Sequence, residues 1–273
     1  MSVSRPGAVG IFDSGVGGLS VWRQIVARLP RESTLYIADQ AHVPYGPRRA
    51  RQLRSLCEAI TDRLLAEGCK AVVVACNTAS AVALHHLRER FPHTPIVGLE
   101  PAVKPAVART RSGVVGVMAT PATFAGRLYK ATVGKHASSV RVVEQLCLGL
   151  ADLVERADLS DPTTAAEAES MLRGFVEPML AQGADTIVLG CTHYPFVLEP
   201  IRRLVGPDLT VIDPAPAVAL QLERVLERHG LLASDNDPSH RFATSGDPVQ
   251  FDRSARWLVG ITAASSPLHW QAF

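Results

Sequence analysis

Two cysteines in this sequence stand directly after short apolar runs, at positions where a buried strand would end. Cys191 follows the run TIVLG, and a histidine, His193, comes two residues later. Cys76 follows the run AVVVA and is itself followed by Asn77 and Thr78. A turn from a strand into a helix presents backbone N–H groups, which lower the pKa of a thiol and bind carboxylate groups. Both thiols are therefore candidate reactive groups.

Taken alone, each thiol leaves more than one chemistry open. Cys191 with His193 is consistent with a nucleophile and its base, or with half of a metal site. No further cluster of cysteine, histidine or aspartate in the sequence completes a metal site, so no metal is expected. The other three cysteines, Cys57, Cys69 and Cys147, are interpreted as small buried hydrophobic residues.

Two thiols that face each other across one small cleft predict a different reaction. One thiolate removes a proton from one face of a carbon atom, and a neutral thiol delivers a proton to the opposite face. A thiol is a weak base for a carbon acid, so the site must be dry and must hold donors that stabilise the developing carbanion. We therefore expect a two-base racemisation with Cys76 and Cys191 as the acid/base groups.

The stretch FDSGVGGLS, residues 12–20, places further polar groups after an apolar run. Its glycines indicate a tight turn that brings the backbone close to a ligand. The spacing does not match the dinucleotide-binding fingerprint, and the lysine of a P-loop is absent. We expect Asp13 beside the first thiol, where it assists proton transfer, and Ser14 hydrogen-bonded to a carboxylate. The alternative is that Asp13 only caps the following helix.

A turn-rich loop, ADQAHVPYGPRR, follows the second apolar run of the chain. Tyr45 and Gly46 stand between two prolines in this loop and offer a hydroxyl and a backbone N–H to an anionic group. The alternative is a β-turn with a tyrosine on the surface.

The elements that must position these residues alternate between strand-like and helix-like segments. Several strand-like runs lack polar alternation, which indicates strands that are covered on both faces in a parallel sheet. An α/β fold is therefore predicted. The expected strands are residues 8–13, 34–38, 71–75, 96–99, 114–119, 140–145, 186–190 and 209–212, with another near 241–243. The expected helices include residues 48–67 and 217–230, and a final helix near the end of the chain.

A weak internal repeat relates the two thiol segments. Residues 9–25 resemble residues 115–130 in layout, and residues 71–81 resemble residues 186–196. The repeat predicts two pseudo-symmetric α/β domains with parallel-type sheets, each offering one cysteine at the carboxyl end of a strand. The active site is then expected in the cleft between the domains.

Proline-rich stretches suggest where the chain crosses between these domains. Residues 93–110 and 210–220 are the candidate crossings. We accordingly assign residues 1–99 and 214–273 to the first domain, and residues 100–213 to the second.

Composition limits the classes of function. Hydrophobic residues make up 47% of the 273 residues, charged residues make up 20%, and the net charge is +2. This balance indicates a soluble globular protein and favours neither nucleic acid nor a membrane as a partner. The first residues lack the apolar segment of a secretory signal, and five irregularly spaced cysteines indicate reduced thiols. We therefore expect a cytoplasmic protein.

Together, these motifs resemble those of a known family. GIFDSGVGGLSV, ADQAHVPYG, ACNTASA, EPAVKPA, GVMATPAT and LGCTHYPF occur in order from about residue 8 to residue 213. In this they are similar to the cofactor-independent glutamate racemases of the aspartate/glutamate racemase superfamily. The resemblance implies interconversion of L- and D-glutamate without a cofactor, supply of D-glutamate for peptidoglycan, and a homodimer.

The resemblance also assigns roles to individual residues. It implies that Cys76 acts on D-glutamate and Cys191 on L-glutamate, assisted by Asp13, His193 and Glu155. The positions that match substrate-contacting residues are Asp13, Ser14, Tyr45, Gly46, Asn77, Thr78, Thr120, Thr192 and His193.

Two positions depart from the family pattern. Leu148 stands where the family usually has proline, which bears on the alignment through Glu155, and Pro214 stands where it tends to have serine. Two alternatives to glutamate racemisation remain at this point: racemisation of another substrate, such as aspartate or a hydantoin, and a non-catalytic ligand-binding protein on the same fold.

Overall fold

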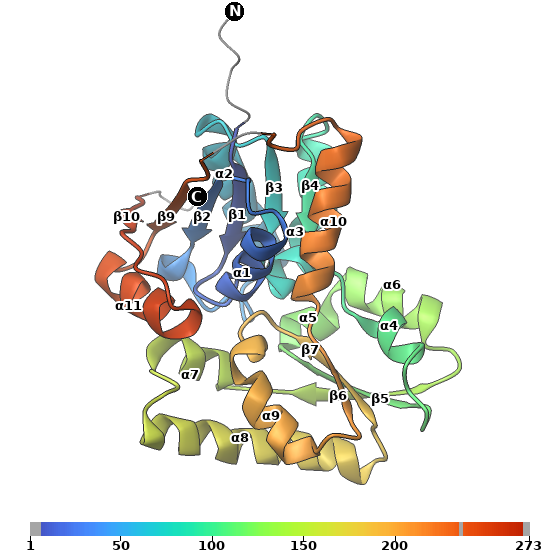
Figure 1. Cartoon of the computed structure of the whole chain (residues 1–273). Helices are drawn as coiled ribbons and strands as arrows, with labels where there is room; N and C mark the ends of the chain where they lie inside the picture. The colour runs from blue at the N-terminus through green and yellow to red at the C-terminus, as the bar shows by residue number, and fades with distance from the viewer. Residues whose placement is uncertain (1–6, 235–236, 270–273) are drawn as a thin grey trace, which may run out of the picture.

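Residues 7–234 and 237–269 are described by a computed structural model, in which the chain forms two parallel β-sheets stacked as two lobes (Figure 1). The upper lobe in Figure 1, called the first lobe here, is built from both ends of the chain. The lower, second lobe holds the middle of the chain.

The first lobe contains a six-stranded sheet with the strand order β10-β9-β2-β1-β3-β4. Its strands are β1 (Val9–Asp13), β2 (Thr34–Ala38), β3 (Ala71–Val74), β4 (Ile96–Gly98), β9 (His240–Thr244) and β10 (Ser266–Pro267). Its helices are α1 (Leu19–Arg28), the 3₁₀ helix η1 (Gln40–His42), α2 (Ala50–Ala66), α3 (Asn77–Arg90), α10 (Ala215–Arg228) and α11 (Pro248–Val259).

The second lobe contains a four-stranded sheet with the order β6-β5-β7-β8. Its strands are β5 (Val114–Ala119), β6 (Arg141–Leu146), β7 (Thr186–Gly190) and β8 (Thr210–Ile212). Its helices are α4 (Val103–Val107), α5 (Pro121–Ala125), α6 (Arg127–His136), α7 (Leu150–Arg156), α8 (Pro162–Ala181), the 3₁₀ helix η2 (Tyr194–Val197) and α9 (Leu198–Val205).

The two sheets share one strand order. The sequence β2-β1-β3-β4 in the first lobe corresponds to β6-β5-β7-β8 in the second, and all of these neighbours pair in parallel. The first thiol follows β3 and the second follows β7, which occupy equivalent places. The internal repeat predicted from the sequence is therefore present as a repeat of topology.

Strand register brings the polar residues of each lobe together at the carboxyl edge of its sheet. In the first lobe Phe12 pairs with Val74, so the residues that follow, including Asp13, lie beside the turn that carries Cys76. In the second lobe Ala119 pairs with Gly190, immediately before Thr120 and Cys191.

Helices cover both faces of each sheet, as the continuous apolar runs predicted. In the first lobe α1, α10 and α11 pack on one face, and α2 and α3 pack on the other. In the second lobe α7, α8 and α9 cover one face, and α4 and α6 cover the other. Strands buried on both faces need no polar side chains, so functional polar groups are confined to the strand ends.

The predicted α/β class with parallel sheets is confirmed, and most predicted elements differ from the observed ones by only one or two residues. The short strand β10 was not predicted, because two residues leave no periodic pattern. The division into domains 1–99 plus 214–273 and 100–213 stays a prediction, and residues 1–6, 235–236 and 270–273 of it lie outside the described residues. In residues 7–234 and 237–269, no helix combines the length and the apolar character needed to cross a membrane.

Candidate active site

On the first lobe, Cys76 caps the amino end of α3 and lies next to Asp13 and Ser14. The Ser14 hydroxyl bridges the two groups, since its Oγ is 3.2 Å from Asp13 Oδ1 and 3.9 Å from Cys76 Sγ. Asp13 is fully buried and accepts hydrogen bonds from the backbone N–H groups of Ser14 and Gly18. Gly18 precedes α1, so Asp13 holds the start of that helix and also lies beside the thiol. Its part in proton transfer stays a prediction.

On the second lobe, the other thiol is the first member of a chain of three side chains. Cys191 Sγ lies 3.5 Å from His193 Nδ1, and His193 Nε2 lies 2.6 Å from Glu155 Oε1. Cys191 and His193 are buried, with 7% and 4% of their surface exposed. The structure thus brings Glu155, on α7, into the site despite the departure at Leu148, whose side chain is exposed.

The two thiols differ in how their strands continue. After β3 the chain enters the α-helix that begins at Asn77, whereas after β7 it enters only the short 3₁₀ helix η2. The expected α-helix amino terminus is therefore present at Cys76 alone, and His193 is the polar neighbour of Cys191.

The glycine-rich loop of the first lobe allows the second lobe to approach closely. A Cβ atom on Gly15 would overlap the Glu155 carboxylate, and one on Gly17 would lie 2.5 Å from the His193 ring. The backbone N–H of Val16 donates to Glu155 Oε1 at 2.8 Å. The sequence predicted a close approach to a ligand, and the structure adds that these glycines make room for Glu155 and His193 of the other lobe.

Thr192 of the second lobe forms hydrogen bonds to the first lobe within the site. Its hydroxyl donates to Asp13 Oδ2 at 3.2 Å, and its carbonyl accepts a hydrogen bond from Ser20 Oγ at 2.8 Å. Asp13 from one lobe and Thr192 from the other are therefore in direct contact, and the two thiol neighbourhoods form one site.

Burial and neighbouring charges raise the pKa values of three titratable groups in the site. Burial raises the pKa of Cys76 well above its ordinary value of 9.0, and the nearby charges of Asp13 and Cys191 raise it further. Burial also raises the pKa of Asp13, although the positive charge of His193 opposes this. Burial alone would lower the pKa of His193, but Cys191 and Glu155 outweigh it, and this pKa lies well above its usual range.

The consequence is an asymmetric pair of thiols. Cys76 is held as a neutral thiol at neutral pH, and His193 is held as an imidazolium. Cys191 Sγ faces this imidazolium at 3.5 Å. The two thiols therefore have different electrostatic surroundings within one site.

Three predicted substrate-contacting residues, Asn77, Thr78 and Thr120, lie at the amino ends of α3 and α5. Asn77 is buried, yet its Oδ1 atom has no hydrogen-bond partner among the described residues. A buried carbonyl oxygen without a donor is costly, and a ligand ammonium group would supply the donor. Thr78 Oγ1 lies 3.1 Å from Thr120 Oγ1, which links the ends of α3 and α5 across the lobes.

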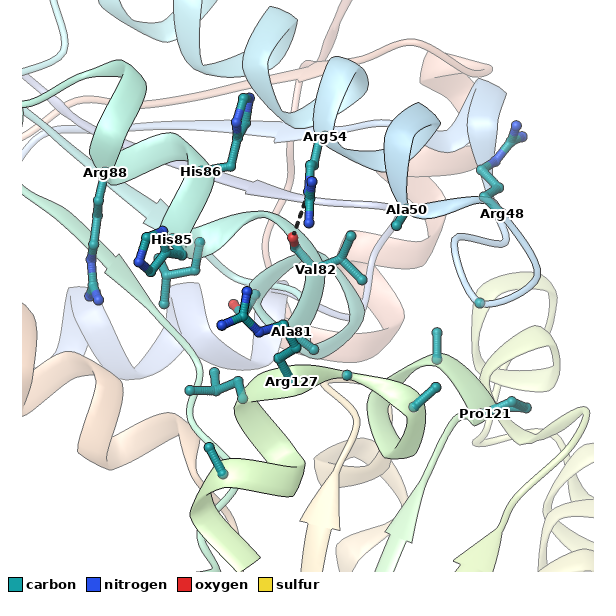
Figure 2. A pocket seen from close by; sticks show the side chains of 18 of the residues that line it. Arg48, Ala50, Arg54, Ala81, Val82, His85, His86, Arg88, Pro121 and Arg127 are labelled. Atoms are coloured by element: carbon teal, nitrogen blue, oxygen red, sulfur yellow. Dashed lines mark hydrogen bonds between the residues drawn. The ribbon is translucent and has the colours of Figure 1, made fainter. Parts of the chain in front are cut away.

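Tyr45 and Gly46, two further predicted ligand contacts, lie in the loop before α2. The Tyr45 hydroxyl is buried and donates to Asp39 Oδ2 at 2.7 Å, so it is engaged within the first lobe. Gly46 lies on the wall of a separate cavity of about 1060 Å³ that runs between α2, α3, α5 and α6. Figure 2 shows Arg54, Arg88 and Arg127 around this cavity, and neither thiol lines it.

Sequence reasoning missed two residues that contact this network. Gln40 Nε2 donates to Glu155 Oε2 at 3.3 Å, and the hydroxyl of Thr244, at the end of β9, donates to Gln40 Oε1 at 2.8 Å. Gln40 stands inside the ADQAHVPYG motif, but its relation to Glu155 depends on the packing of the lobes, which local sequence does not encode.

Comparison with known proteins identifies the family. Residues 9–222 match the sequence model of the family described as Asp/Glu/hydantoin racemase. The chain belongs to this family. It is 52% identical over 255 residues to the glutamate racemase of Ectopseudomonas mendocina, covering 93% of this chain and 95% of that protein. It is also 52% identical over 253 residues to that of Pseudomonas aeruginosa, covering 93% of this chain and 94% of that protein.

Solved structures from the same family have the same fold. Glutamate racemase isoform RacE1 from Bacillus anthracis superposes with a TM-score of 0.88 at 32% identity, covering 97% of this chain and 98% of that one. The Escherichia coli glutamate racemase in complex with L-glutamate and an activator superposes with a TM-score of 0.82 at 28% identity, covering 96% and 99%. The resemblance inferred from the motifs is confirmed. As a member of this racemase family, the protein is an isomerase.

Proposed function

We propose that this racemase interconverts L- and D-glutamate by a two-thiol mechanism without a cofactor. The observation that carries the proposal is the pair of buried cysteines after the equivalent strands β3 and β7, each with its own acid/base partner. Relatives 52% identical over almost the whole chain are glutamate racemases, which supports glutamate as the substrate. The D-glutamate formed would supply peptidoglycan synthesis.

In the L-to-D direction, the Cys191 thiolate removes the α-proton of L-glutamate and becomes a thiol. Cys76 gives its proton to the opposite face of the α-carbon and becomes a thiolate. The enzyme is then left with the two protonation states exchanged, and one proton must return through the site before the next L-glutamate reacts. Asp13 beside Cys76 and His193 beside Cys191 are the groups that carry this proton.

The remaining contacts hold the substrate and stabilise the carbanion. The unpartnered Asn77 Oδ1 accepts from the substrate ammonium group, and the hydroxyls of Thr78 and Thr120 donate to its carboxylates. Ser14 and Thr192 stay in the proposed substrate set, although in this structure their hydroxyls donate to Asp13. Tyr45 and Gly46 stay in the proposed substrate set through their loop, although in this structure the Tyr45 hydroxyl is bonded to Asp39. Burial of both thiols keeps water out, which strengthens every charge interaction with the developing carbanion.

The direct test is circular dichroism of L-glutamate, and separately of L-aspartate, incubated with the purified protein and no added cofactor. We expect the signal of L-glutamate to decay to zero, because enantiomers are equally stable in solution. Decay with L-aspartate alone would replace glutamate by aspartate as the substrate. No decay with either, together with binding of glutamate, would favour a ligand-binding protein. A homodimer and a cytoplasmic location stay predictions, which sedimentation and cell fractionation would check.

The pH profile provides a second test of the proposed roles. Because the pKa of Cys76 is raised, its proton is retained through pH 9 and is lost only at higher pH, so the alkaline limb of kcat/KM should lie above pH 9. In Asp13→Asn a negative charge beside the thiol is gone, so the thiol loses its proton more easily and the limb should move to lower pH. The pKa of the substrate amino group is the same in assays of the wild type and of Asp13→Asn, so it does not account for a difference between the two pH profiles. An unmoved limb in Asp13→Asn would contradict the role of Asp13.

A further inference from the structure

Gln40 occupies a place where the first lobe touches the acid/base chain of the second. It is the first residue of η1, just after β2, and β2 pairs with β9 so that Ala38 faces Thr244. Gln40 and Thr244 therefore meet at the carboxyl edge of the first sheet. Thr244 is fully buried, and it comes from the segment that returns to this lobe after the second lobe is complete.

The hydrogen bonds of Thr244 fix the orientation of the Gln40 amide. Thr244 Oγ1 accepts the backbone N–H of Gly246 at 3.0 Å, which leaves its own proton to donate to Gln40 Oε1 at 2.8 Å. The amide oxygen is thereby held toward Thr244, and the NH₂ group faces Glu155 Oε2 at 3.3 Å. The reversed amide would set its oxygen against a carboxylate oxygen.

The Glu155 carboxylate depends on this contact for one of its two oxygens. Oε1 accepts a hydrogen bond from the backbone N–H of Val16 and is hydrogen-bonded to Nε2 of His193. Oε2 has Gln40 as its hydrogen-bond partner among residues 7–234 and 237–269. A carboxylate with both oxygens engaged is held in one plane, and the hydrogen bond to His193 requires that plane to stay fixed.

We propose that Gln40 is a positioning residue that holds Glu155 against His193 through a hydrogen bond oriented by Thr244. Strand β9, which ends at Thr244, is thereby linked through Gln40 to Glu155 and the Cys191 side of the site. The role rests on the proposed racemisation for its catalytic consequence, whereas the contact itself is independent of any reaction.

The test compares Gln40→Leu, Gln40→Glu, Thr244→Val and Thr244→Ser. Gln40→Leu keeps the volume but removes the donor, and kcat/KM for L-glutamate should fall about tenfold, since hydrogen bonds to charged groups are of that strength. Gln40→Glu keeps the shape but sets a second carboxylate beside Glu155, so it should be more damaging than leucine. Thr244→Val should also lower kcat/KM, whereas Thr244→Ser, which keeps the hydroxyl, should retain the wild-type activity. A residue that only fills space would tolerate leucine without loss of activity.

A titration of His193 by NMR of histidine-labelled protein gives a readout that does not depend on activity. His193 is assigned by comparison with His193→Asn, and Glu155, Cys191 and Asp13 are the charged groups that face it. Loss of the Gln40 contact loosens Glu155, so the pKa of His193 should fall in Gln40→Leu and in Thr244→Val but not in Thr244→Ser. An unchanged titration in all four folded variants overturns the proposal. If the wild type fails to racemise glutamate, the proposed function fails, and the titration still decides the role of Gln40.

Discussion

Racemisation of glutamate is expected to fall by roughly 10³-fold or more when either Cys76 or Cys191 is replaced by serine. A serine hydroxyl is far less acidic than a thiol, so it neither forms the anion that removes the α-proton nor gives up its proton readily. Circular dichroism of L-glutamate measures the loss.

Exchange of the α-proton with solvent deuterium separates the two roles. In Cys76→Ser the Cys191 thiolate remains, so L-glutamate should exchange its α-proton in D₂O without forming the D-enantiomer. In Cys191→Ser the converse is expected for D-glutamate. Cys69→Ser is the matched control, because Cys69 is a buried thiol at the opposite end of β3 from Cys76. Retention of more than about a tenth of the wild-type rate in either site variant would exclude two obligatory thiols.

Replacement of Lys70 by methionine should lower the free energy of unfolding by about 3–5 kcal/mol. The ammonium group of Lys70 lies 2.6 Å from Glu32 Oε2, and both side chains are buried in the first lobe. The other oxygen of Glu32 accepts the backbone N–H of Ala233 at 2.8 Å. Without the lysine, a buried carboxylate remains with no opposite charge. Urea unfolding measures the effect.

Two further variants separate the loss of the pair from the loss of a side chain. Lys70→Met combined with Glu32→Gln removes both charges and keeps an acceptor for Ala233, so most of the lost stability should return. Arg28→Met breaks an ion pair with Glu223 that is partly exposed to solvent, and it should cost about 1 kcal/mol or less. If Lys70→Met is no more damaging than Arg28→Met, the buried pair is not what stabilises this part of the lobe.

The sequence by itself determined the fold class, every strand except β10, and the two candidate thiols. These features are local: an unbroken apolar run such as residues 71–74 has to be covered on both faces, and polar groups appear where it ends. The repetition of that pattern around Cys76 and Cys191 also indicated two similar lobes, and the shared strand order confirms it.

The tertiary structure alone decided which side chains of the two lobes meet. Val16 and Glu155 are 139 positions apart, and their hydrogen bond depends on how one lobe is set against the other. The same packing places Gln40 on Glu155, and a contact within the first lobe turns the Tyr45 hydroxyl to Asp39. Local sequence patterns carry no information on such contacts, because a long-range hydrogen bond follows from the relative position of whole elements.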